Sequence, residues 1–247
     1  MRTRTKIVLA ILTAILACAI GFIVWAETPL GPMPEVEAAL HSDSVVEISK
    51  TGGLAFYPHG TSPSTGLILY PGGRVDYRSY APVARAIATQ GYLVVIVRMP
   101  LNLAVLDANK AVGVIRSYPA ITTWVVGGHS LGGAMAARFA SNHVSEVSGL
   151  VLWAAYPPSG SDLSRTDVAA VTIRGSNDGL ASAADIDRSL ARLPESTIRV
   201  EIEGGNHAQF GYYGDQPGDG KAAISREEQV RQTVEATVQL LQRTRAR

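Results

Sequence analysis

One serine in the sequence has the neighbours of a catalytic nucleophile. Gly128, Ser130 and Gly132 form a G-x-S-x-G motif, and Gly133 follows it. The apolar run TTWVV precedes the motif and the helix-like segment LGGAMAARFAS follows Ser130, which is the strand–turn–helix setting that a nucleophile elbow requires. Small flanking residues let strand and helix approach while the serine takes a strained backbone conformation. We therefore predict that Ser130 is a nucleophile, aimed from the N-terminus of a helix that favours developing negative charge.

A serine nucleophile needs a general base, and chain position separates the five histidines. His207 lies in the segment EGGNH, directly after the last predicted strand and downstream of the serine. A neutral imidazole near pH 7 can take the serine proton and return it to the leaving group. The other histidines fall in the N-terminal segment, a turn, the variable position of the motif and a helix end, namely His41, His59, His129 and His143. His207 is the predicted base.

The base in turn needs a carboxylate that fixes its tautomer and stabilises the imidazolium. Asp178 lies in the segment RGSNDG, right after the predicted strand AAVTI, and so projects from a loop at the edge of the sheet. The segment AAYPPS after the preceding strand contains no acid, and Glu201 and Glu203 are close to His207 along the chain. Asp178 is the predicted acid of a Ser–Asp–His triad.

An acyl-transfer site also needs N–H donors for the oxyanion. The segment YPGGR over residues 70–74 ends a predicted strand, at the position where one donor is supplied. Its glycines let the backbone approach a substrate with no Cβ in the way. We predict Gly73 as the first donor, with Arg74 as the alternative, and the residue after the nucleophile, Leu131, as the second.

These motifs must be positioned by a sheet. Apolar, β-branched runs predict eight strands, over residues 45–49, 54–57, 67–70, 92–97, 123–126, 150–154, 169–173 and 198–202. Helical patterns lie over 80–90, 105–117, 131–141, 183–193 and 225–241. The turn TGG between the first two strands predicts a hairpin, and the alternation that follows predicts a mostly parallel sheet flanked by helices. This is the strand count of the α/β-hydrolase fold.

Four segments together resemble the α/β-hydrolase superfamily, most closely its small bacterial members of the "fold-5" type: residues 70–74, 128–133, 176–179 and 204–207. The resemblance covers about residues 45–243 and implies an esterase-like activity without cofactor or metal, through an acyl-enzyme on Ser130. Pro71 stands where many relatives carry histidine, which leaves the geometry of the oxyanion loop open. Because the family contains lipases, esterases, thioesterases and lactone hydrolases, the fold does not select a substrate.

The loops give some indication of the substrate site. Between Tyr156 and Val168 there are too few residues for the helical cap that many hydrolases of this fold insert, so we expect no cap domain and an open site. Candidate substrate-binding residues come from loops at the catalytic edge, and each could equally pack in the core: Arg74, Met99, Leu101, Leu103, Trp153, Tyr156, Phe210, Tyr212 and Tyr213.

The N-terminal residues predict a membrane helix. From Ile7 to Ala26 the only clearly polar side chain is Thr13, and as a helix this run spans about 30 Å, the thickness of a bilayer's hydrocarbon core. Three basic residues, Arg2, Arg4 and Lys6, precede it, so the N-terminus should stay in the cytoplasm and the catalytic domain should lie outside. We favour an uncleaved anchor in the cell membrane over a cleavable signal peptide, which would make the protein secreted.

These features divide the chain into three parts: residues 1–26 as the basic flank and transmembrane segment, 27–44 as a linker, and 45–247 as the catalytic domain. The linker assignment rests on three prolines and several acids, and we expect the segment to hold the domain off the membrane surface.

A hydrophobic content of 47% supports a large core. The net charge of +1 gives no reason to expect a nucleic-acid partner. The single Cys18 excludes an intrachain disulfide and a thiolate metal cluster, and the oligomeric state stays open.

The leading functional hypothesis is a serine hydrolase that cleaves a small-molecule carboxylic ester, thioester or lactone. Two alternatives remain: an acyltransferase or perhydrolase with the same triad, and a non-catalytic, membrane-tethered scaffold. The intact set of Ser130, Asp178 and His207 argues against the scaffold.

Overall fold

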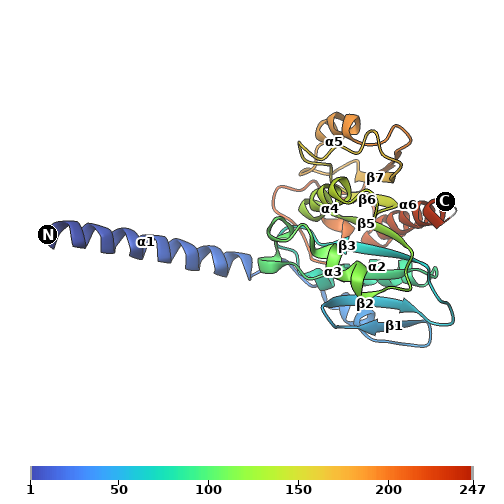
Figure 1. The fold of residues 1–247 in the computed structure, drawn as a ribbon, viewed down its shortest axis with the longest axis horizontal. Coiled ribbons are helices and arrows are strands. Elements are labelled where there is room, and N and C mark those ends of the chain that lie inside the picture. Colours follow the sequence, from blue (N-terminus) through green and yellow to red (C-terminus); the bar gives the residue numbers. More distant parts are fainter. Residues whose placement is uncertain (1, 246–247) are drawn as a thin grey trace.

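Eight strands form one sheet, as the sequence predicts (Figure 1), and their order in the sheet is β1-β2-β4-β3-β5-β6-β7-β8. The structure is a computed structural model that describes residues 2–245, so Met1 and residues 246–247 of the predicted parts lie outside the described residues. The strands are β1 (Val46–Ser49), β2 (Gly53–Pro58), β3 (Thr65–Tyr70), β4 (Leu93–Val97), β5 (Thr123–His129), β6 (Gly149–Trp153), β7 (Ala169–Gly175) and β8 (Ile198–Ile202). The β1–β2 and β2–β4 pairs are antiparallel and the other pairs are parallel.

Helices cover both faces of this sheet because its central strands are apolar on both sides. Every residue of β3 and β4 is buried. One core cluster joins the sheet to α2 (Ala81–Ala88) and α6 (Arg226–Arg245), and a second joins the opposite face to α3 (Lys110–Ser117) and α4 (Leu131–Asn142). The remaining helical elements are α5 (Ala183–Ser189) and the short 3-10 turns η1 (Pro34–Leu40), η2 (Tyr77–Tyr80), η3 (Pro100–Asn102), η4 (Ala104–Leu106), η5 (Leu190–Arg192) and η6 (Ala208–Phe210).

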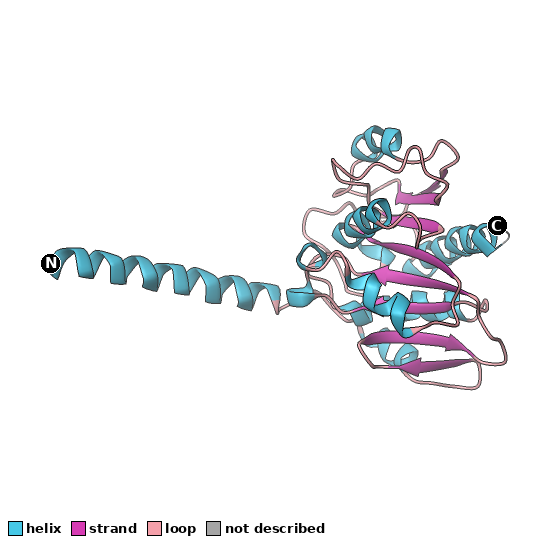
Figure 2. Cartoon of the chain, in the orientation of Figure 1, coloured by secondary structure: helices cyan, strands magenta, loops and turns pink. Residues whose placement is uncertain are grey.

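The parallel strands bring their carboxyl ends to one edge of the sheet. In Figure 2 the arrowheads of these strands point toward the side of the body where the long N-terminal helix α1 (Arg2–Ala26) joins it. The loops that leave this edge include all four motif segments. Parallel register therefore brings Gly73 and His207, which are 134 positions apart in the sequence, to one end of the sheet.

The predicted helix over residues 105–117 begins later than expected. In the structure α3 starts at Lys110, and the preceding residues form the loop of η3 and η4. Val105 and Leu106 are therefore exposed rather than packed on the sheet. Their apolar character extended the helical pattern in the sequence although these side chains do not face the core.

Helix α1 carries the predicted membrane-spanning segment. Its residues Thr5–Ala26 are long and apolar enough to cross a membrane, and none of its most apolar stretch is buried against the body. A signal sequence near an N-terminus can meet the same criteria of length and composition. In Figure 1 the helix projects away from the sheet and the C-terminus lies on the opposite side of the body.

The segment over residues 27–44 does not behave as the predicted linker, because it packs on the body. Val36, Ala39 and Leu40 are buried in the same core cluster as α2, and Leu30 forms a parallel bridge with Val75. The spacing of the three buried residues places them on one face of a helical turn. Proline content gave the segment the composition of a linker, while these few apolar side chains determine that it is part of the fold.

Arg74 fixes the end of α1 directly to the body. Its Nε donates to the carbonyl oxygen of Trp25 at 2.8 Å, and its Nη2 donates to that of Thr28 at 2.8 Å. The guanidinium also lies over the Trp25 ring, 4.2 Å from the centroid, and Asn102 Nδ2 donates to the carbonyl oxygen of Ala26 at 3.0 Å. The bonds to Trp25 and Ala26 satisfy carbonyls that a helix leaves unpaired at its C-terminus, and the bond to Thr28 holds the residues just beyond it. The spacer expected between helix and domain is therefore replaced by a fixed joint.

The packed segment makes a testable prediction. Leu40→Ala should destabilise the body by about 2 kcal/mol or more, because the substitution opens a cavity against α2. Val45→Ala, at an exposed side chain in the same stretch of chain, should change the free energy of unfolding by less than about 0.5 kcal/mol. Urea unfolding of the full chain in detergent, followed by tryptophan fluorescence, measures both; equal values would mean that the segment is a linker after all.

Candidate active site

Ser130 sits in a strained turn between β5 and α4. Its backbone has φ 52° and ψ −124°, a left-handed conformation that costs a non-glycine residue free energy. Two backbone bonds hold it: Ser130 N donates to the carbonyl oxygen of Trp153 at 3.0 Å, and Ala134 N donates to that of Ser130 at 3.0 Å. Close packing completes the constraint, because a Cβ at Gly132 would lie 2.2 Å from the carbonyl oxygen of Pro71. The turn can form only where that residue is glycine.

The predicted base and acid lie side by side. His207 Nδ1 is 2.9 Å from Asp178 Oδ2, and both side chains are only 2% exposed. The other carboxylate oxygen of Asp178 accepts hydrogen bonds from Leu180 N at 2.8 Å and Ala181 N at 2.7 Å. The backbone thus orients the carboxylate, and the carboxylate places a proton on Nδ1 of the imidazole. This tautomer leaves Nε2 as a proton acceptor.

Ser130 and His207 line one pocket of about 350 Å³. His207 Nε2 is buried and has no hydrogen-bond partner among the described residues. Nε2 can therefore accept a proton from a group that reacts in this pocket. The hydrogen bond between a catalytic serine and its base is often long while no substrate is bound. The structure brings all three predicted triad residues to one edge of the sheet, with the acid–base pair formed.

The oxyanion loop lies against the nucleophile turn. A Cβ at Gly73 would be 3.0 Å from Leu131 Cδ2, so the residues of the two predicted donors are neighbours. The amide of Arg74, the alternative donor, already donates to the carbonyl oxygen of Asn102 at 2.8 Å. The amide of Gly72 donates to the Tyr80 hydroxyl at 3.0 Å. Because both neighbouring amides are occupied, the geometry favours Gly73 within this loop.

A buried pair that sequence reasoning missed supports this loop. The Tyr80 hydroxyl, which accepts from Gly72 N, lies 2.8 Å from His129 Nδ1 and can donate its proton there. Burial raises the pKa of Tyr80, and burial together with the neighbouring His207 lowers the pKa of His129 well below its usual range. Neutral His129 also packs against the His207 ring, with centroids 4.5 Å apart. The sequence showed His129 only as the variable position of the motif, and Tyr80 carried no signal.

Asp219 is a second residue that the sequence did not single out. Its Oδ1 accepts from Gly179 N at 3.1 Å, His207 N at 3.2 Å and Gly220 N at 2.7 Å, and its Oδ2 accepts from Ala208 N at 2.8 Å. This carboxylate therefore ties the loop of the acid to the loop of the base. The sequence over residues 211–220 is rich in glycine and other turn-forming residues, which gives no reason to choose this aspartate.

The pocket walls differ from the predicted substrate-binding set. The lining residues are Ser130, Leu131, Ala134, Ala154, Ala155, Tyr156, Leu180, Ala181, His207 and Gln216, so Tyr156 is the one predicted residue among them. Trp153, Phe210, Tyr213 and Met99 are buried in the core, and Trp153 Nε1 donates to Thr237 Oγ1. Arg74 is engaged by α1. Most of the predicted aromatic side chains thus turn into the core, and residues of α4 and of the loops after β6 and β7 form much of the pocket wall in their place.

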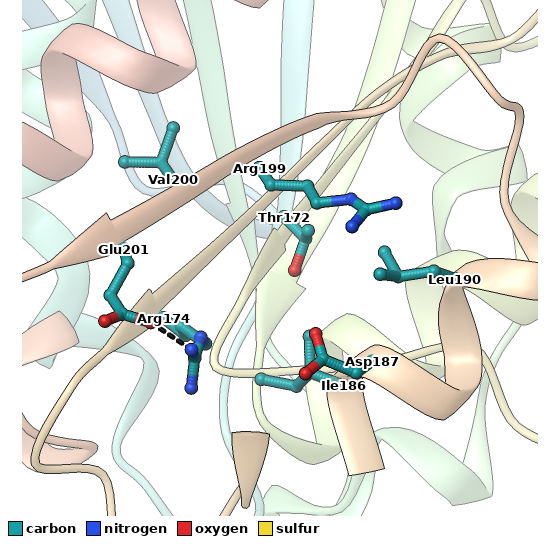
Figure 3. Close-up of a pocket in the computed structure, with 8 residues that line it drawn as sticks. All are labelled: Thr172, Arg174, Ile186, Asp187, Leu190, Arg199, Val200 and Glu201. Atoms are coloured by element: carbon teal, nitrogen blue, oxygen red, sulfur yellow. Dashed lines mark ion pairs between the residues drawn. The ribbon is translucent and has the colours of Figure 1, made fainter. Parts of the chain in front are cut away.

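A smaller cavity of about 140 Å³ lies away from this site, between β7, β8 and α5 (Figure 3). Its lining includes an ion pair between Arg174 and Glu201, together with Arg199 and Asp187. The two basic and two acidic side chains balance one another. None of the predicted catalytic residues lines this cavity.

The buried His129 predicts a pH dependence of stability. Its folded pKa is depressed below the ordinary 6.5, so the unfolded chain binds the proton more tightly and stability falls as pH drops below about 6.5, by up to about 1.4 kcal/mol per unit. His129→Asn, which keeps an acceptor for Tyr80, should remove this part of the acid sensitivity. His143→Asn, at a partly exposed histidine paired with Glu146, is the control. Urea unfolding midpoints at pH 7.5 and 5.5 measure the loss of stability on acidification. If that loss is the same in His129→Asn as in the wild type, His129 is not its source.

A comparison with protein families agrees with this geometry. The sequence profile of the alpha/beta hydrolase family matches residues 66–231, which include β3 to β8 and all three residues of the predicted triad. No curated protein sequence matches the chain significantly. The match covers well over half of the chain, and the sheet has the eight strands that the sequence predicts. The chain therefore belongs to the alpha/beta hydrolase family.

Proposed function

We propose that this hydrolase cleaves a carboxylic ester, thioester or lactone through an acyl-enzyme on Ser130. Membership of the family supports hydrolysis in general. The observation that carries the finer proposal is the Asp178–His207 pair, whose Nε2 is unpaired in the pocket that Ser130 lines. That pair supplies a base of fixed tautomer beside a strained serine, which is the arrangement of a serine nucleophile with its base.

The proposed reaction has two halves. Ser130 Oγ attacks the carbonyl carbon while His207 Nε2 takes the hydroxyl proton, and the N–H groups of Gly73 and Leu131 stabilise the oxyanion. The tetrahedral intermediate collapses, the bond to the leaving alcohol or thiol breaks, and His207 returns the proton to that group. Water then attacks the acyl-enzyme with His207 again as base, and the acid leaves as Ser130 is reprotonated. Asp178 stabilises the imidazolium in both halves.

The pocket supports a small acyl group. Its walls are mainly apolar, with Leu131, Tyr156 and Leu180 as the larger side chains. The connection between β6 and β7 has no helix in the structure, so no cap covers the site. An acyltransferase or perhydrolase would use the same residues and differ only in the acceptor. Identifying the products formed with water, alcohols and hydrogen peroxide as acceptors separates these activities.

We also propose that α1 remains attached as a membrane anchor, with the catalytic domain outside the cytoplasm. The three basic residues ahead of the apolar run support that orientation. Ala26 is fully buried, and the carbonyl oxygens of Trp25 and Ala26 accept bonds from Arg74 and Asn102. Cleavage after Ala26 would break these contacts, which supports an anchor over a removable signal.

Ser130→Ala tests the nucleophile. The variant should fold normally and lose roughly 10⁶-fold in kcat, because triad residues act as a unit. A fluorophosphonate probe should label the wild-type protein and leave this variant unlabelled. Ser159→Ala, at an exposed serine after β6, should keep both activity and labelling. Labelling that persists in Ser130→Ala would assign the nucleophile to another residue.

Asp178→Asn tests the acid. The loss in kcat should be large, roughly 10⁴-fold, yet smaller than that of Ser130→Ala, because the carboxylate orients and stabilises but does not react. Asp185→Asn, at an aspartate on α5 that pairs with Arg188, is the control and should stay near wild type. Activity on a p-nitrophenyl ester measures both variants. If Asp178→Asn is active while Glu203→Gln is not, Glu203 is the acid.

A further inference from the structure

The loop of η3 and η4 presents apolar side chains to solvent at the edge of the sheet that carries the site. Val105 and Leu106 are 53% and 51% exposed, and Leu101 and Leu103 beside them are half-buried. Outside α1, the exposed large apolar residues of the described chain are Val45, Val105, Leu106, Val144 and Leu180. Only Val105 and Leu106 are neighbours in sequence among these, and exposed apolar side chains that gather on a surface can mark an interaction site.

This loop is attached to the end of α1. Asn102 donates from Nδ2 to the carbonyl oxygen of Ala26, and the carbonyl oxygen of Asn102 accepts from Arg74 N. The green segment that follows β4 in Figure 1 lies where α1 joins the body. Leu106 is four residues beyond Asn102, so a fully extended chain would place it at most about 14 Å away. The loop therefore stays close to the level at which the apolar helix ends.

The attachment is held in one geometry. Arg74, Leu101 and Asn102 all have positive φ, at 55°, 49° and 54°, and such strain persists in non-glycine residues only where surrounding contacts impose it. Those contacts are the bonds between this loop, Arg74 and the last residues of α1. Trp25, in the last turn of α1, is 47% exposed, and tryptophan is enriched where a membrane helix meets water.

We propose that the loop over residues 100–106 rests on the lipid bilayer that α1 spans, with Val105 and Leu106 in the interface. The polar interface of a bilayer adds about 5–7 Å on each side of its hydrocarbon core, a depth that the short link from Ala26 to this loop can match. The occupant of the patch is thus a lipid surface, because the apolar helix that ends beside it enters one.

This contact determines where the site opens. Arg74, which holds α1, directly follows Gly73, and Gly73 packs on Leu131 at the wall of the pocket. Leu180, also on the pocket wall, is 40% exposed. The catalytic edge therefore faces the bilayer, and the substrate is an ester presented at the membrane surface. The docking of the loop rests on the proposed anchoring by α1, and the inference on the substrate rests in addition on the proposed ester hydrolysis.

The depth of the loop can be measured in the full chain without any assay of activity. In a Cys18→Ser background, single Val105→Cys, Leu106→Cys and Val144→Cys variants are labelled with an environment-sensitive fluorophore and placed in phosphatidylcholine–phosphatidylglycerol vesicles. Val144 is the matched control, since it is 48% exposed and precedes β6 at the opposite edge of the sheet. We expect blue-shifted emission and quenching by brominated lipids at positions 105 and 106, with neither at 144.

Equal, water-like emission at all three positions would overturn the proposal. Blue-shifted emission that disappears when the protein is diluted to one molecule per vesicle would also overturn it, because the patch would then contact a second copy of the chain. Emission that is independent of protein density supports the lipid surface.

A second measurement addresses the substrate. The double variant Val105→Ser/Leu106→Ser should hydrolyse a water-soluble p-nitrophenyl ester at the wild-type rate and lose about tenfold on an ester embedded in vesicles, since about 1.4 kcal/mol of apolar docking corresponds to that factor. An equal loss on both esters would assign the loop a structural role and contradict the proposal. If the wild-type protein cleaves neither ester, the proposed function fails, while the fluorescence still decides the docking.

Discussion

The contact between the Ser130 turn and the end of β3 constrains everything else at this edge of the sheet. Gly132 has room for no side chain against Pro71, and Ser130 keeps its left-handed backbone because β6 and α4 hold it by hydrogen bonds. The free-energy cost of this strain is met by the buried sheet beneath it, where parallel strands pack on both faces. The same contact brings the oxyanion loop beside Leu131, so nucleophile and donors are placed together.

Around this contact, carboxylates set the position of the base. Asp178 accepts two backbone N–H groups through one oxygen and faces His207 with the other. Asp219 accepts four backbone N–H groups and joins the loops on which Asp178 and His207 lie. Behind them, Tyr80 and His129 connect the oxyanion loop to the imidazole. Hydrogen bonds from these surrounding residues therefore hold the proposed catalytic groups in place before a substrate binds.

Arg74 connects helix α1 to the proposed active site. Arg74 binds the carbonyl oxygen of Trp25 in the last turn of α1 and that of Thr28 just beyond it, and it directly follows Gly73 in the oxyanion loop. The end of the N-terminal helix therefore has a fixed position relative to the proposed site, whereas a flexible linker would have let the two move independently. Under the proposed membrane anchoring, the orientation of the domain on the bilayer follows from this joint.

The fold class and the eight strands along the chain could be read from the amino-acid sequence alone, because buried parallel strands and helices leave strong periodic patterns. The sequence also proposed Ser130, Asp178 and His207, since a strand–turn–helix glycine motif and loops after strands are local features. That Trp153 packs inward and that residues 27–44 pack on the body became evident only from the three-dimensional contacts. These contacts alone revealed Asp219, because hydrogen bonds between a side chain and distant backbone groups leave no periodicity in a sequence.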